Sequence, residues 1–200
     1  MEDILILAID IGNTNIVVGC IRGDEVLFTE RLSTNTTHTT LEYAISFKNV
    51  LEIYQIDAKE IEGAIISSVV PPITNVIRDS IHKITDAEVL IVGPGVKTGL
   101  NILMDDPRQV GSDRIVNAVA VVHEYPVPAA IIDMGTATTI CVVDEKKNYI
   151  GGAIIPGMRI AADTLTARTA QLPKISLEPP AKLIGKNTVD CMKSGVFYGN

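Results

Sequence analysis

Two segments of this chain share one design, and their aspartates, Asp10 and Asp133, lie 123 positions apart. In the first segment an apolar run is followed by the polar turn Asp10-Ile-Gly-Asn-Thr-Asn15 and then by a second apolar run. The other segment repeats this order around Asp133-Met-Gly-Thr-Ala-Thr-Thr139. An apolar run, a glycine-containing polar turn and another apolar run predict a β-hairpin. Two copies at this separation indicate a duplicated half-domain with a ligand held between the halves.

The residue types in both turns suit a nucleotide. Glycine lets the backbone approach a ligand without a Cβ, and successive turn N–H groups can form an anion nest. The aspartate suits a cation that accompanies phosphate rather than phosphate itself. One copy alone is equally typical of an ordinary hairpin turn; two copies favour a clamp for a metal–nucleotide complex.

Composition limits the class of protein. The chain has 200 residues, 46% of them hydrophobic, with a mean hydropathy of +0.29 and a net charge of −7. These values predict a folded core in one large domain or two lobes, and the lack of a basic patch argues against nucleic acid. The apolar runs are too short to span a membrane, and Glu2 and Asp3 stand where a secretory signal carries positive charge. Three unpatterned cysteines are typical of a reducing compartment, so we expect a soluble cytoplasmic protein.

The pattern of apolar residues predicts an α/β fold in two related halves, 1–117 and 118–200. Each half begins with a three-strand antiparallel meander, and the second lacks two strands and at least one helix of the first. We therefore expect the chain to be incomplete and the natural protein to continue for about 50 residues. The expected strands are 4–9, 15–22, 25–33, 63–69, 88–92, 129–134, 137–144 and 148–155; the expected helices are 40–55, 71–84, 107–124, 157–168 and one starting near 187.

Two other patterns carry little weight. The segment Gly93–Gly99 has Lys97-Thr98, but Val96 stands where a Walker loop needs glycine, and the dinucleotide-binding spacing is missed by one residue. The three histidines have no metal-ligand spacing.

The expected helix 107–124 carries the residues best suited to act on an alcohol. Asp113 could accept a proton, Arg114 could bind an anionic group, and Gly111 permits close approach to that face. Asn117 lies one helical turn after Asp113. The alternative is a solvated ion pair near a helix N-terminus, and spacing alone favours this alternative.

Five motifs, in order, closely resemble the type III pantothenate kinases of the actin-like, acetate and sugar kinase superfamily. They are Asp10–Asn15, Val110–Arg114 with Asn117, Asp133–Thr139, Gly151–Gly157, and Gly185–Thr188 with Ser194-Gly195. The resemblance implies duplicated actin-like (ribonuclease H-like) half-domains, each a mixed sheet with flanking helices. It also implies ATP-dependent phosphorylation of pantothenate to 4'-phosphopantothenate, the first step of coenzyme A biosynthesis.

The resemblance also implies a role for individual residues. Asp113 is expected to be the catalytic proton acceptor, and Asp10 to lie near Mg²⁺. Asp133 is expected to bind a monovalent cation, K⁺ or NH₄⁺. The ATP-binding residues would be Asp10, Ile11, Gly12, Asn13, Thr14, Asn15, Ile16, Val17 and Thr136; the pantothenate-binding residues would be Met104, Gly111, Ser112, Asp113, Arg114 and Thr188.

Two residues depart from the family pattern. Met104 stands where tyrosine commonly lines the pantothenate pocket, which keeps an apolar filler and loses a phenol hydrogen bond. Ser112 stands where alanine is usual. As in the family, we expect a homodimer, with ATP and pantothenate as the small-molecule partners and neither nucleic acid nor membrane.

Other functions remain open from the sequence. The chain could be a non-catalytic relative, such as an actin-like ATPase or an accessory transcription factor, which would need the clamps but not Asp113. It could also be a kinase of another small alcohol, given Met104.

Overall fold

The computed structural model describes residues 4–200, so Glu2 and Asp3 lie outside the described residues. The chain folds as two compact units. The first comprises residues through Thr98 together with Asp106–Val116; the second comprises Gly99–Asp105 and Asn117–Asn200.

The first unit is built on a five-stranded mixed sheet in the order β3-β2-β1-β4-β5. The strands β1 (Leu5–Ile11), β2 (Asn15–Arg22) and β3 (Glu25–Ser33) form the predicted antiparallel meander. The strands β4 (Gly63–Ser68) and β5 (Glu88–Ile91) run parallel to β1. Polar residues at the carboxyl end of β1 therefore lie beside the carboxyl end of β4.

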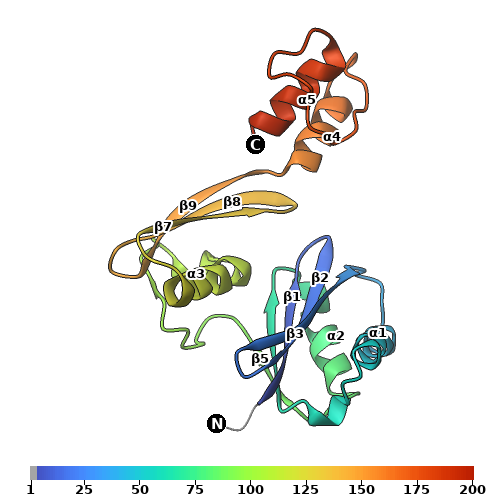
Figure 1. Ribbon diagram of the computed structural model, residues 1–200, viewed down its shortest axis with the longest axis vertical. Coiled ribbons are helices and arrows are strands. Elements are labelled where there is room, and N and C mark those ends of the chain that lie inside the picture. Colours follow the sequence, from blue (N-terminus) through green and yellow to red (C-terminus); the bar gives the residue numbers. More distant parts are fainter. Residues whose placement is uncertain (1–3) are drawn as a thin grey trace. The chain divides into compact units, whose positions relative to one another are not determined.

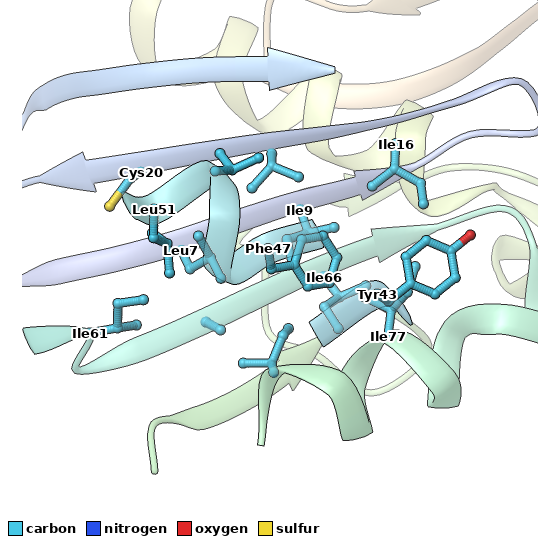
Figure 2. Close-up of a cluster of buried hydrophobic side chains, with 14 of the residues drawn as sticks. Leu7, Ile9, Ile16, Cys20, Tyr43, Phe47, Leu51, Ile61, Ile66 and Ile77 are labelled. Carbon is cyan, nitrogen blue, oxygen red and sulfur yellow. The ribbon is translucent and has the colours of Figure 1, made fainter. Parts of the chain in front are cut away.

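Helices α1 (Thr40–Ile53) and α2 (Pro71–Ile81) cover this sheet and pack against each other (Figure 1). A short 3₁₀ turn, η1 (Ala58–Glu60), follows α1. Helix α1 begins with a capping box in which Thr39 and Glu42 bond each other's backbone N–H. Burial of its apolar side against β1, β2, β4 and α2 makes one continuous core, shown in Figure 2, which includes Leu7, Phe47 and Ile66.

The second unit has a four-stranded sheet in the order β6-β9-β8-β7. Strands β7 (Ala129–Met134), β8 (Ala137–Val143) and β9 (Asn148–Pro156) form the second predicted meander (Figure 1). Helices α4 (Met158–Arg168) and α5 (Thr188–Tyr198) pack together after it. The two-residue strand β6 (Asn101–Ile102), parallel to β9, was not predicted, because two residues carry no readable alternation.

The prediction of one helix from Pro107 was wrong. Residues Pro107–Gln109 form a separate 3₁₀ turn, η2, capped by the Asp106 side chain. Val110 then adopts an extended conformation (φ −74°, ψ 121°), which interrupts the helical hydrogen bonds, so helix α3 runs over Ser112–Glu124.

The expected α/β class is confirmed, with a three-strand antiparallel start to each mixed sheet and helices at their flanks. Within residues 4–200, none of the helices combines the length and apolar character needed to cross a membrane.

Candidate functional site

The residues after Asp10 form a tight turn that joins the core strands β1 and β2. Asp10 is exposed at the end of β1, while its neighbours Ile9 and Ile11 are buried. The Gly12 N–H donates to the Asn15 carbonyl at 2.9 Å, and a Cβ on Gly12 would lie 3.1 Å from that oxygen. A larger residue would therefore press on the turn, which explains the glycine in this motif.

The start of α3 is joined to the strand that neighbours Asp10. The Ser112 hydroxyl accepts a hydrogen bond from the Ser68 N–H at 2.8 Å and donates to the Ser68 carbonyl at 2.9 Å. The Ser67 hydroxyl donates to the Ser112 hydroxyl at 3.2 Å. Ser67 and Ser68 are the β4 partners of Asp10 and Ile11. One buried hydroxyl thus holds Asp113, the next residue along, at the strand end that carries Asp10.

Ser67 and Ser68 were not predicted to belong to the site. Their only sequence signal is two hydroxyl residues at the end of an apolar strand, and this signal becomes informative once the register of β4 against β1 is known.

Gly111 makes room for the Asp113 carboxylate. A Cβ on Gly111 would lie 2.4 Å from Asp113 Oδ1, far inside van der Waals contact. The same oxygen accepts the Arg114 backbone N–H at 2.8 Å. The close approach predicted at Gly111 is therefore made by Asp113 itself, and the carboxylate has a defined orientation.

The Arg114 guanidinium bonds the main chain. Its Nη2 donates to the Gln109 carbonyl at 3.3 Å, and among residues 4–200 the ion pairs do not include one between Asp113 and Arg114. A few residues earlier, Arg108 donates to both carboxylate oxygens of Asp106. This bonding to the Arg108 side chain lowers the pKa of the Asp106 carboxyl, and the cap of η2 is the Arg108 backbone N–H donating to Asp106 Oδ1 at 3.2 Å.

The second turn, within the second unit, also closes through its glycine, with a hydrogen bond that spans one residue fewer than in the first turn. The Gly135 N–H donates to the Ala137 carbonyl at 3.1 Å, and exposed Asp133 stands near the end of β7 as Asp10 stands near the end of β1. The Asn117 side-chain amide donates to Asp133 Oδ2 at 3.2 Å. The structure thus brings together Asn117 and Asp133, which the sequence placed in separate motifs.

Gly157 fits against the same turn. Its N–H donates to the Thr136 carbonyl at 3.1 Å. A Cβ on Gly157 would lie 2.4 Å from the Gly135 carbonyl oxygen and 2.5 Å from that of Thr136. The last glycine of the Gly151–Gly157 motif is therefore needed for α4 to begin against this loop.

The other predicted substrate residues of the second unit lie apart in the described contacts. Met104 lies over Gly151, where a Cβ would be 3.4 Å from its sulfur and where φ is +118°. Thr188 is exposed at the first residue of α5, directly after the Asn187 cap, whose side chain accepts the Asp190 N–H at 2.9 Å.

The residues present suit a metal ion that is held mainly by the phosphates of a bound nucleotide and less by protein side chains. Across residues 4–200, no three His, Cys, Asp or Glu side chains are grouped as a metal cluster. Mg²⁺ in phosphate-transfer sites often uses only one or two carboxylates, with phosphates and water completing its octahedron. The single exposed carboxylate of Asp10 fits that arrangement.

Comparison with known proteins agrees with these motifs. A family model of type III pantothenate kinase matches residues 6–200. The type III pantothenate kinase of Brevibacillus brevis is 47% identical over 195 residues, which cover 98% of this chain and 76% of that protein. The enzyme of Moorella thermoacetica is also 47% identical, over 98% of this chain and 77% of its own length.

A solved structure from Campylobacter jejuni is similar in fold, with a TM-score of 0.56 over 96% of this chain and 74% of that one. Its description assigns it to a Baf family of transcriptional activators, and at 17% identity the likeness concerns the fold alone. The family match and the close relatives, taken with the five motifs, lead to one conclusion: this chain belongs to the type III pantothenate kinase family.

Proposed function

We propose that this protein is a kinase that transfers the γ-phosphoryl group of ATP to the hydroxyl of pantothenate, giving 4'-phosphopantothenate and ADP. This reaction begins coenzyme A biosynthesis. The observation that carries the proposal, beyond family membership, is the Ser112 hydroxyl, which holds the Asp113 end of α3 to the strand paired with Asp10. Phosphoryl transfer needs mainly such positioning and neutralisation of charge.

Asp113 is the proposed proton acceptor. The alcohol oxygen forms a bond to the γ-phosphorus, the bond to the ADP oxygen breaks, and the alcohol proton passes to the Asp113 carboxylate. Gly111 leaves space for this carboxylate, and the Arg114 N–H orients it. Because the metaphosphate-like transition state carries little proton transfer, an ordinary carboxylate suffices.

The loop Asp10–Val17 is the proposed ATP phosphate loop, with a second contact from Thr136. Its glycine and turn N–H groups suit an anion, and Asp10 would hold Mg²⁺ through its carboxylate. Mg²⁺ would supply charge neutralisation on the phosphates.

Asp133 is the proposed ligand of K⁺ or NH₄⁺. These ions favour oxygen donors, which the exposed Asp133 carboxylate provides. The Asn117 amide, 3.2 Å from Asp133 Oδ2, would hold the carboxylate in place.

Gly111, Arg114, Met104 and Thr188 are the proposed pantothenate contacts, with Arg114 binding the substrate carboxylate as a planar fork. Ser112 belongs to this set through its backbone position, because its hydroxyl is engaged with Ser67 and Ser68.

The protein is further proposed to act as a cytoplasmic homodimer, with an apolar interface that includes α4. Two apolar side chains of α4, Ile160 and Leu165, are 41% and 36% exposed, which supports such a contact. Light scattering at micromolar concentration should give twice the monomer mass; a monomer mass would refute this part.

The decisive test is an assay of ADP release with pantothenate and a panel of other small alcohols, with the phosphorylated product identified by mass spectrometry. Turnover with pantothenate supports the proposal. Turnover only with another alcohol would favour a different kinase activity, which the methionine sulfur of Met104 over Gly151 makes worth testing.

A further inference from the structure

The segment between β3 and α1 is bonded to the proposed ATP phosphate loop. The Thr34 N–H donates to the Thr14 carbonyl at 3.0 Å. The Thr34 hydroxyl donates to the Gly12 carbonyl at 2.6 Å. One residue thus holds two main-chain carbonyls of a four-residue turn, from a position 22 residues away from Gly12 in sequence.

Thr34 is itself held through its neighbour. The Tyr43 hydroxyl accepts the Asn35 N–H at 3.0 Å and donates to the Asn35 carbonyl at 2.8 Å. Tyr43 is only 1% exposed and its ring belongs to the core cluster, while its hydroxyl lies at the edge of the cluster in Figure 2. A buried aromatic ring with few rotamers makes a stiff support for a loop.

The rest of the segment is also ordered by its own hydrogen bonds. The Asn35 carboxamide oxygen accepts both the N–H and the hydroxyl of Thr37, at 3.0 and 2.7 Å. Thr39 and Glu42 then close the capping box of α1. The segment is therefore fixed at its β3 end and at its α1 end.

This bonding determines the direction of an N–H group in the phosphate loop. A trans peptide is planar, so its carbonyl and its N–H point in opposite directions. The Thr34 hydroxyl fixes the Gly12 carbonyl, and the Asn13 N–H of the same peptide must therefore point away from Thr34. Catalytic stabilisation of phosphate charge depends on donors that are oriented before the ligand arrives.

We propose that Thr34, supported by Tyr43 through Asn35, is a positioning residue that orients the ATP phosphate loop. This inference rests on the proposed function of that loop. It adds a residue from outside every motif of the family resemblance, and it assigns a purpose to the buried hydroxyl of Tyr43.

The test compares variants of the full chain. Thr34→Val keeps the shape and β-branching and removes the hydroxyl, whereas Thr34→Ser keeps the hydroxyl. Tyr43→Phe removes the hydroxyl that bonds the Asn35 backbone and so supports Thr34. Thr29→Val is the matched control, since Thr29 is an exposed threonine on β3, the strand that ends one residue before Thr34. Titration with Mg·ATP gives Kd; steady-state assays give kcat and both KM values.

We expect Thr34→Val to weaken ATP binding, in Kd and KM, by about 3- to 10-fold, the usual worth of one such hydrogen bond. The KM for pantothenate should change by less than about twofold, Thr34→Ser should bind ATP nearly as the wild type does, and Tyr43→Phe should shift the ATP Kd in the same direction as Thr34→Val. If Thr34→Val does not fold, the ATP Kd of Tyr43→Phe decides whether the inference holds.

Three results would overturn the inference: an ATP Kd in Thr34→Val equal to that of Thr29→Val, equal losses in Thr34→Val and Thr34→Ser, or equal rises in the KM of both substrates. A wild type that binds ATP without phosphorylating pantothenate refutes the proposed function instead. The ratio of the ATP Kd of Thr34→Val to that of Thr29→Val then still tests the role of Thr34. A wild type that binds no ATP refutes both.

Discussion

Replacing Gly111 by alanine should damage catalysis without damaging the fold. The added Cβ would lie 2.4 Å from Asp113 Oδ1, whereas ordinary contact begins near 3.4 Å. The carboxylate must therefore move by about 1 Å, a displacement that can cost about 100-fold in rate when it affects a reacting group. The next nearest atom outside Asp113, Cγ1 of Val69, is at 3.6 Å, so the backbone has no other reason to shift.

The cost in stability should be small. Gly111 has no positive φ, and its carbonyl accepts the first α3 hydrogen bonds from Arg114 and Ile115, so it occupies the helix N-cap. Alanine is a poorer N-cap than glycine by about 1 kcal/mol or less. Gly111→Ala should therefore lower the free energy of unfolding by no more than that, while kcat with pantothenate falls by about 10- to 100-fold.

The assay is ADP release at saturating ATP and pantothenate, together with urea unfolding. Gly93→Ala is the control, because its added Cβ meets nothing within 4 Å. If Gly111 acts through Asp113, the double variant with Asp113→Asn should be no slower than Asp113→Asn alone. A normal kcat in Gly111→Ala, or losses that multiply in the double variant, would refute the reasoning.

Four further outcomes are expected. Asp113→Asn should lower kcat by about 10²- to 10⁴-fold with an unchanged Kd for ATP, and a near-normal kcat would place the base elsewhere. Arg114→Lys should raise the KM for pantothenate by about 3- to 10-fold with little change in kcat, because a point charge replaces a fork; an unchanged KM would exclude Arg114 as the carboxylate anchor. Wild-type turnover should depend on added K⁺ or NH₄⁺, and Asp133→Ala should remove this dependence with most of the rate; equal turnover in sodium buffer counts against the assignment. The pKa of Asp144 is lowered by hydrogen bonds from the Asn148 side chain and backbone, so the unfolded state binds its proton at higher pH than the folded state does. Its stabilising contribution is present above the ordinary aspartate pKa near 4 and is lost as the pH falls through the lowered value; Asp144→Asn should flatten this part of the acid dependence in urea unfolding, and an unchanged slope would contradict it.

Much of the secondary structure followed from local pattern. The two meanders, helices α1 and α2, and the turns at Asp10 and Asp133 were predicted within a few residues of their observed bounds. Period-2 and helical spacing of apolar residues are properties of short windows, and burial then acts on the same residues that make the pattern. The start of α3 was predicted too early because a proline-initiated 3₁₀ turn and the first turn of an α-helix have the same sequence signature. The extended conformation of Val110, which separates the two elements, has no such signature.

The chemistry of the candidate site was predicted as separate motifs, and its supports were not predicted at all. Asp10, Asp113 and Asp133 stand out because aspartate beside glycine in a turn or at a helix start is chemically distinctive. Ser67, Ser68, Thr34 and Tyr43 do not stand out, since hydroxyl residues at strand ends and in loops are common.

The sequence by itself determined the duplicated strand–turn–strand design, the α/β class and the family, because these depend on residue types at short spacings along the chain. Only the tertiary structure decided which groups meet: Ser112 with Ser68, Thr34 with Gly12, and Asn117 with Asp133. Each of these contacts joins residues at least 16 positions apart, so it depends on strand register and helix packing. Hydrogen bonds need donor and acceptor within about 3.5 Å, and no local pattern carries that information across such separations.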